Sequence, residues 1–310
     1  HLKNTGQFQS YVVGNDIRAE SAWNVAIGTG QTVVAVVDDG VTFDHPDLAA
    51  NMWRNPREVA NNCVDDDGNG IVDDVHGADM VLGIGDVSPY FPRIESDHGT
   101  MVAGVIAARG NNNEGSSGVL WNTQLMALKI EGPQSSNYSL FVSDFVKALS
   151  YVVAQRRAGV NVRVVNISYG GVSDTQSYRD ALVAAGNAGI LVVVAAGNDG
   201  SSSLADLGYP SAWQLPNVLS VGSLTPANTR AASSNFGSLV NIFAPGENIL
   251  TTSIFASGPV ELDLIRPGYR WISGTSFSAP VVAGAAALMM DAYPSSSFSA
   301  VRNRMLATAT

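Results

Sequence analysis

A serine stands where a long apolar helix is predicted to begin. Ser276 lies in the segment SGTSFSAP, directly ahead of the apolar run VVAGAAALMM. The first turn of a helix has backbone N–H groups without partners and carries the positive end of the helix dipole. Such a place suits an oxygen that becomes negatively charged during a reaction, although a serine before a helix usually only caps it. The role of Ser276 therefore depends on which other residues lie nearby.

Two further polar residues complete a set that can carry out acyl transfer. Asp38 ends the apolar run TVVAVVD, and His98 opens the glycine-rich segment HGTMVAG. A histidine takes the proton from a serine hydroxyl near neutral pH, and a buried carboxylate fixes the tautomer of that histidine and stabilises its charged form. Asp38, His98 and Ser276 thus predict attack by the Ser276 oxygen on a carbonyl carbon.

Strand-like and helix-like segments alternate along the chain and must position these residues. The β-branched apolar run at 32–38 is typical of a parallel strand buried on both faces. Further strands are predicted at 124–130, 162–168, 190–198, 217–223 and 239–246, and helices at 98–109, 139–159, 174–189, from 276 onward and at 296–309. This order predicts a three-layer α/β fold, a largely parallel sheet with helices on both faces, in one domain covering residues 1–310. The helix after Ser276 has almost no polar side, so we expect it to be buried all round.

Composition excludes several classes of partner. The chain has 310 residues, and 17 basic against 27 acidic side chains give it a formal charge of −10. Such a charge disfavours nucleic acid and anionic membranes and favours bound cations. Cys63 is the single cysteine, so no internal disulfide forms. No apolar run reaches the roughly 18 residues that cross a bilayer, which predicts no membrane span. The chain starts at His1 with no visible signal peptide, so we interpret it as a processed form.

Five motifs occur in one order along nearly the whole chain. They are VVAVVDDGVTFDHPDL, DHGTMVAGVIAA, VVNISYGG, VVVAAGNDG and SGTSFSAPVVAGAAAL. In these motifs the sequence resembles the subtilisin-like serine proteases, whose catalytic residues follow the order Asp, His, Ser. The resemblance implies that Asp38 orients His98, that His98 is the general base and that Ser276 is the nucleophile. It also implies that Asn198 is an oxyanion-hole residue, donating a hydrogen bond to the tetrahedral intermediate.

The same resemblance implies a binding site for an extended peptide. One wall of the pocket for the residue before the scissile bond is expected at Ser168, Tyr169, Gly170 and Gly171, and the opposite wall at Ala195, Ala196 and Gly197. Small side chains on both walls predict an open slot that prefers large apolar residues. The segment 131–139 is expected to supply a second edge strand that pairs with the substrate backbone.

Two acidic residues leave the specificity open at this point. Asp39 follows Asp38 directly, as in the proprotein-processing branch of the family, where the second acid favours a basic residue beside the cleavage-site residue. Asp39 is either such a selectivity residue or a plain solvated carboxylate. Asp206 is expected near the base of the pocket, where it would favour basic side chains.

An acidic insertion at about 61–76 forms the second strong signal. In DDDGNGIVDD, the acids and the glycine follow the spacing of the first eight positions of an EF-hand calcium loop. His76 stands where the twelfth-position glutamate would be, so the loop is not an EF-hand. We expect one structural Ca²⁺ here, since similar insertions occur in some subtilisin-like proteases, and the alternative is an acidic surface loop without an ion. The expected ligands are Asp65, Asp67, Asn69, Asp74 and the carbonyl oxygen of Ile71.

The resemblance finally implies partners and a compartment. Protein or peptide substrates, an N-terminal prodomain removed on maturation of a zymogen, and a secreted or extracytoplasmic location are expected. Two alternatives remain at this point. The chain could be a processing protease or transpeptidase acting on one partner protein, or a non-catalytic protein that only binds peptides.

Overall fold

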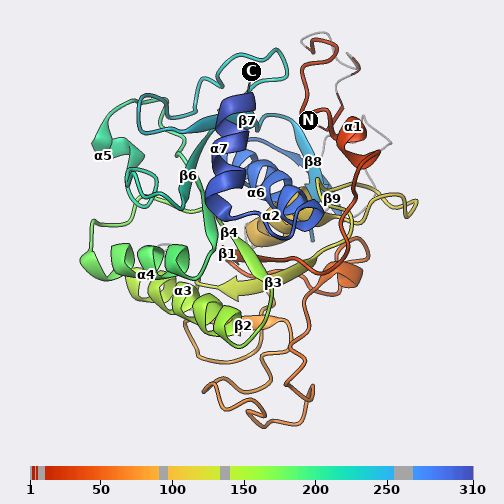
Figure 1. The fold of residues 1–310 in the computed structure, drawn as a ribbon, viewed down its shortest axis with the longest axis vertical. Helices are drawn as coiled ribbons and strands as arrows, with labels where there is room; N and C mark the ends of the chain where they lie inside the picture. Colours follow the sequence, from red (N-terminus) through yellow and green to blue (C-terminus); the bar gives the residue numbers. More distant parts are fainter. Residues whose placement is uncertain are drawn as a thin grey trace.

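Seven parallel strands form the central sheet of the molecule (Figure 1). A computed structural model describes residues 2–3, 5, 11–90, 97–132, 140–254 and 268–309. The strand order is β2-β3-β1-β4-β5-β6-β7, and all six neighbouring pairs are parallel. The strands are β1 (Val33–Asp38), β2 (Gly77–Asp79), β3 (Gln124–Lys129), β4 (Val162–Ile167), β5 (Leu191–Ala195), β6 (Val218–Leu224) and β7 (Ile242–Pro245).

Helices cover both faces of this sheet, which confirms the predicted three-layer α/β class. The helices are α1 (Ala19–Trp23), α2 (His98–Ala107), α3 (Val142–Arg157), α4 (Gln176–Asn187), α5 (Leu204–Leu207), α6 (Thr275–Ala292) and α7 (Phe298–Thr308), with a short 3₁₀ helix η1 (Ala49–Asn51). Strand β1 shows why its sequence is apolar throughout. Val34 and Val36 pack with α2 and α6 on one face, whereas Val33 and Val37 pack with α3 and α4 on the other. A strand buried on both faces needs no polar alternation.

Helix α6 runs through the middle of one layer. None of its 18 residues is exposed, so the predicted all-round burial is confirmed. By length and composition it is the one helix among the described residues that could span a bilayer, so the expectation that no segment reaches that length was wrong. In the fold, 78% of that window is buried, as in the core helix of a folded domain.

A small antiparallel sheet was not predicted from the sequence. It pairs β8 (Ile249–Thr252) with β9 (Tyr269–Ile272). The hydroxyl groups of Thr251 and Thr252 donate hydrogen bonds of 2.7 Å to the carbonyl oxygens of Met101 and Thr100. This sheet therefore fastens helix α2, the helix that begins with His98, to the strand β9 that precedes α6.

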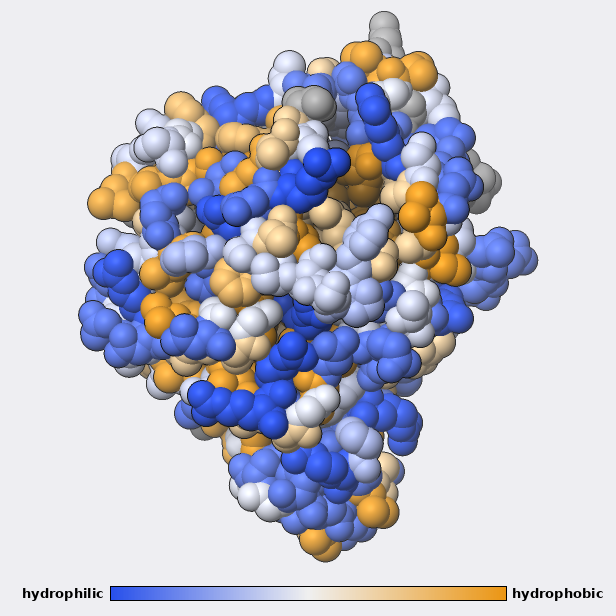
Figure 2. Space-filling view, viewed as in Figure 1, coloured by the Kyte–Doolittle hydropathy of each residue, from blue (hydrophilic) through white to orange (hydrophobic). Residues whose placement is uncertain are grey.

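The segment between β1 and β2 extends away from the sheet at the lower end of Figure 1. It includes the acidic insertion. Figure 2 shows this projection as mostly hydrophilic, in keeping with its sequence.

Candidate active site

Asp38 and His98 meet at the carboxyl end of the sheet. Asp38 is the last residue of β1, and His98 is the first residue of α2. The Nδ1–H group of His98 donates to Oδ1 of Asp38 at 2.7 Å, with the Asp38 side chain 1% exposed and that of His98 21% exposed. Gly99 allows this close approach, because a Cβ atom there would lie 2.2 Å from the carbonyl oxygen of Gly40.

The charges around His98 set the pH at which it can accept a proton. Burial lowers the pKa of His98, but the negative charge of Asp38 and the hydrogen bond that His98 donates to it, together with the charges of Asp39 and Asp97, outweigh burial and raise that pKa to about 9. A base must be neutral to take a proton. The imidazole is therefore available as a base on the alkaline side of neutrality.

Ser276 lies beside this pair, in the first turn of α6 and partly exposed. Its hydroxyl donates to the carbonyl oxygen of Ser168 at 3.1 Å, and among the described contacts it makes no hydrogen bond to His98. The ring of the next residue, Phe277, packs 5.5 Å from the ring of His98 between centroids. The backbone at the start of α6 is thus close to the imidazole.

Asn198 follows strand β5 and faces the start of α6. Its side-chain oxygen accepts hydrogen bonds from the backbone N–H and the hydroxyl of Thr275, at 2.9 and 3.0 Å. The side chain is exposed, and among the described contacts its NH₂ group has no protein acceptor. The oxygen of the amide is therefore fixed to the residue before Ser276, which leaves the amide donors available.

The predicted pocket walls lie near these groups, but their side chains differ in availability. Gly170 and Gly171 are exposed, and a Cβ atom at Gly171 would meet nothing within 4 Å. Tyr169 packs with its ring 5.2 Å from that of His98. The Ser168 hydroxyl is committed, because it donates to the Ser276 carbonyl oxygen at 2.8 Å and accepts from Asn166 at 2.9 Å. In this predicted wall the backbone at Gly170 and Gly171 is exposed, while the Ser168 side chain is bonded within the protein.

The residues predicted for the opposite wall are more deeply buried. Ala195 and Ala196 are 6% and 0% exposed and pack in apolar clusters. Gly197 has a positive φ of 97°, and a Cβ atom there would lie 2.5 Å from the amide nitrogen of Asn235. Of the predicted substrate strand at 131–139, residues 133–139 lie outside the described residues.

Asp39 is buried, so the solvated carboxylate of one sequence interpretation was wrong. It is 1% exposed, and its two oxygens accept hydrogen bonds from the backbone N–H groups of His98 and Gly99, at 3.0 and 2.7 Å. A carboxylate that is buried and bonded to a helix start is not solvated. Asp206, in contrast, is exposed on α5, where its backbone N–H donates to the Ser203 hydroxyl.

The acidic insertion brings three carboxylates together. One oxygen from each of Glu58, Asp65 and Asp67 lies within 4.8 Å of the others. Oε1 of Glu58 accepts from the backbone N–H groups of Asp66 and Asp67, and its Oε2 is buried with no hydrogen-bond partner. Burial, with the charges of nearby aspartates, raises the pKa of Glu58. A buried, unpartnered oxygen facing other carboxylates fits a cation. Glu58 was missed from the sequence because it lies outside the spaced motif.

Asp74 has a different place from the one predicted. It is fully buried and lies outside this group of three. Its oxygens accept from the Tyr151 hydroxyl and from the amide groups of Asn55 and Asn69, the latter two at 2.9 and 2.8 Å. With these donors, Asp74 anchors the loop to helix α3, which carries Tyr151.

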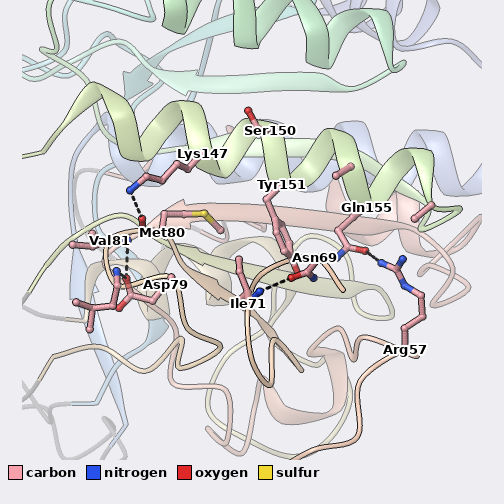
Figure 3. A pocket seen from close by; sticks show the side chains of 14 residues that line it. Arg57, Asn69, Ile71, Asp79, Met80, Val81, Lys147, Ser150, Tyr151 and Gln155 are labelled. Atoms are coloured by element: carbon pink, nitrogen blue, oxygen red, sulfur yellow. Dashed lines mark hydrogen bonds between the residues drawn. The ribbon is translucent and has the colours of Figure 1, made fainter. Parts of the chain in front are cut away.

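A cavity of about 610 Å³ lies between part of this loop, the segment 79–83 and α3 (Figure 3). Arg57 crosses beside it, bonding to Gln155 at 2.6 Å and to Asp67 at 2.9 Å. The lining of this cavity includes none of the residues Asp38, His98 and Ser276. This cavity is therefore separate from the candidate active site.

The fold and the site together define a class, that of α/β proteins with an aspartate–histidine pair and a helix-start serine at the carboxyl edge of a parallel sheet. The chain belongs to the Subtilase family, whose model matches residues 29–310. This is the family of the subtilisin-like serine proteases.

Several known proteins are similar to this chain. Subtilisin of Bacillus pumilus is 34% identical over 287 residues, which are 91% of this chain and 85% of that protein. Halolysin of Haloferax mediterranei is 32% identical over 292 residues, 94% of this chain. The chain spans 47% of the length of halolysin and 59% of a thermophilic serine proteinase of Bacillus sp.. A solved structure described as "Crystal structure of a cold adapted subtilisin-like serine proteinase" superposes with a TM-score of 0.63 at 26% identity, covering 89% of this chain and 81% of the other.

Proposed function

We propose that this chain is a serine endopeptidase and that residues 1–310 form one catalytic domain. The observation that carries the proposal is the 2.7 Å contact between His98 and Asp38 beside a serine in the first turn of α6. Membership of the Subtilase family supports it. In this proposal Ser276 is the nucleophile, His98 the general base and Asp38 the residue that orients it.

The proposed reaction begins when the Ser276 hydroxyl turns from Ser168 to His98. Nε2 of His98 takes the hydroxyl proton while the Ser276 oxygen forms a bond to the substrate carbonyl carbon. The carbonyl oxygen becomes negative and accepts hydrogen bonds from the Ser276 backbone N–H and the Asn198 amide. His98 then donates its proton to the leaving amine, and the C–N bond breaks. Water, activated in the same way by His98, releases the acyl group and restores the Ser276 hydroxyl.

We propose a broad preference for large apolar residues before the scissile bond. The exposed backbone at Gly170 and Gly171 supports pairing with an extended peptide. The sequence offers only small side chains at 195–197 to fill the opposite wall.

A mixed peptide library tests the activity and the preference together. We expect cleavage after large apolar residues, and we expect a serine-reactive organophosphonate to stop it by labelling Ser276. The matched control is protein incubated without the reagent. Absence of both cleavage and labelling would leave a peptide-binding protein, and cleavage confined to basic residues would contradict the preference.

We also propose one structural Ca²⁺ in the insertion. Glu58, Asp65 and Asp67 would hold it, with Asn69 and the Ile71 carbonyl as further oxygen ligands and Asp74 anchoring the loop behind them. Hard oxygen donors of this kind suit Ca²⁺. The ion would neutralise the carboxylates and stabilise the loop, and it takes no part in the acyl transfer.

Removal of calcium is expected to lower the melting temperature. A ligand that binds only the folded state adds about 2.7 kcal/mol at a hundredfold excess over its Kd. Addition of a chelator should remove that contribution, and Mg²⁺ should restore little of it because it demands strict octahedral geometry. Thermal unfolding of the Ser276→Ala protein, which cannot digest itself under this proposal, measures the effect.

Paired variants separate calcium from general charge effects. Asp65→Asn with Asp67→Asn should lose most of the response to chelator. The charge-matched control, Asp174→Asn with Asp180→Asn, lies at the start of α4 and should keep it. If the chelator does not change the melting temperature of the parent protein, that result would contradict the proposed calcium site.

The remaining proposals concern the setting of the enzyme. A secreted or extracytoplasmic location, and maturation from a zymogen by removal of a prodomain, are proposed from the family. One relative, 34% identical over 279 residues, is named an extracellular protease, from Xanthomonas campestris.

A further inference from the structure

The start of helix α2 is capped by an unexpected residue. Asp97 stands at the N-cap position, but its side chain makes no capping hydrogen bond. It accepts instead from the Ser253 hydroxyl and lies 3.7 Å from the Arg270 guanidinium. Asp39, at the end of β1, takes the first two helical N–H groups, those of His98 and Gly99. The helix start is therefore capped by Asp39, which is distant in the sequence, and not by Asp97, which occupies the N-cap position.

This arrangement holds His98 at two points. Asp38 binds the imidazole ring, and Asp39 binds the backbone N–H of the same residue. Both acids come from consecutive positions of one buried strand end, so they move together. Hydrogen bonds from N–H groups to a carboxylate are stronger than bonds between neutral groups, and a negative charge is favoured at a helix start. The Cβ-free backbone of Gly99 packs against the same strand end, which leaves the helix little room to shift.

We infer that Asp39 is a positioning residue for His98, fixing the start of α2 and setting the pH range in which His98 can act as a base. This inference rests on the proposed function, because it concerns the same proton transfer. It differs from both interpretations that the sequence left open for Asp39, a selectivity residue and a solvated carboxylate.

The charges that face His98 support the second half of the inference. Asp38 and Asp39 face it from β1, Asp97 from its own helix start, and Arg270 from β9 is paired with Asp97. Tyr169 and Phe277, which pack on the ring, are uncharged. Burial and the charge of Asp38 outweigh the effects of His98 and the two N–H groups, so the pKa of Asp39 lies well above its ordinary value. The charge of Asp39, when that carboxyl group is ionised, raises the pKa of His98 and so helps to keep His98 protonated.

The test is the pH dependence of kcat/KM. In Asp39→Asn, we expect the acid limb of the profile to move to lower pH by about one pH unit, since a nearby opposite charge shifts a pKa by that order. We also expect kcat to fall, because the Asn side chain presents an NH₂ group to one of the two helical N–H groups. Asp291→Asn is the matched control. Asp291 is also buried and accepts from a backbone N–H and a hydroxyl, both of Thr29, but it lies at the far end of α6. The acid limb of the kcat/KM profile of Asp291→Asn should therefore not move.

A second variant and a second measurement keep the inference testable if Asp39→Asn does not fold. Asp39→Ser keeps one acceptor for the helix start and should show the same shift. In the Ser276→Ala background, NMR titration of His98, one of four histidines, measures its pKa without any catalysis. The role of Asp39 would be overturned if neither the acid limb of the pH profile nor the pKa of His98 moved in the Asp39 variants. An acid limb that moved as far in Asp291→Asn as in Asp39→Asn would overturn it as well. Failure of the parent protein to react with an organophosphonate would instead overturn the proposed function.

Discussion

Ser276→Ala is expected to lower kcat by about 10⁶-fold, the size of the loss on removing the nucleophile of subtilisin. Without the hydroxyl there is no oxygen to form the acyl-enzyme, and only positioning and the oxyanion donors remain. Peptide binding should be nearly unchanged, because the backbone at 168–171 and the helix start are untouched. Hydrolysis of a chromogenic peptide and direct measurement of peptide affinity check the two halves of this expectation.

The matched control for this change lies two residues further along the same helix. Ser278 is fully buried, and its hydroxyl has no hydrogen-bond partner among the described residues. Ser278→Ala therefore removes a serine from α6 without removing an interaction and should keep nearly full activity. If Ser276→Ala retained activity comparable to Ser278→Ala, another residue would have to be the nucleophile.

The second largest effect is expected for Asn198→Ala. Loss of one oxyanion donor costs about 10²–10³-fold in kcat, the value known for the asparagine of subtilisin. KM should change little, since the donor acts on charge that develops only in the transition state. Steady-state kinetics on one peptide, with kcat and KM determined separately, measure the effect.

Substitutions at two neighbouring residues serve as comparisons for this result. Thr275→Val removes one of the two donors that hold the Asn198 oxygen and should cause a smaller fall in kcat. Asp199→Asn changes the next residue of the same loop and should have almost no effect. A rise in KM at constant kcat for Asn198→Ala would mean that the side chain binds the ground state and is not an oxyanion donor.

The layers of the fold were predictable because each signal is local. The β-branched run that became β1 and the apolar run that became α6 each show their burial in consecutive residues. The positions of Asp38, His98 and Ser276 were predictable for a related reason, since each stands at the boundary of such a run.

What could not be predicted depends on residues distant in the sequence. Asp39 caps a helix that begins 59 positions later, and nothing in the pattern VVDDG announces that contact. Glu58 joins Asp65 and Asp67 through the path of an irregular loop. The strands β8 and β9 are four residues each, too short for a periodic pattern to stand out. In each case the three-dimensional path of the chain decides the role of the residue.

The strand order also bears on when this chain becomes active during its synthesis. Strand β1 lies between β3 and β4, so the centre of the sheet cannot close until both later strands exist. Helix α6, with Ser276, packs on β4, β5 and β6 and comes after all seven strands of the sheet. Pairing between such distant segments is slow to form. A nascent copy in which α6 has not yet packed on the sheet would therefore lack the proposed nucleophile Ser276 at the sheet edge, and the proposed activity would arise only once α6 is in place.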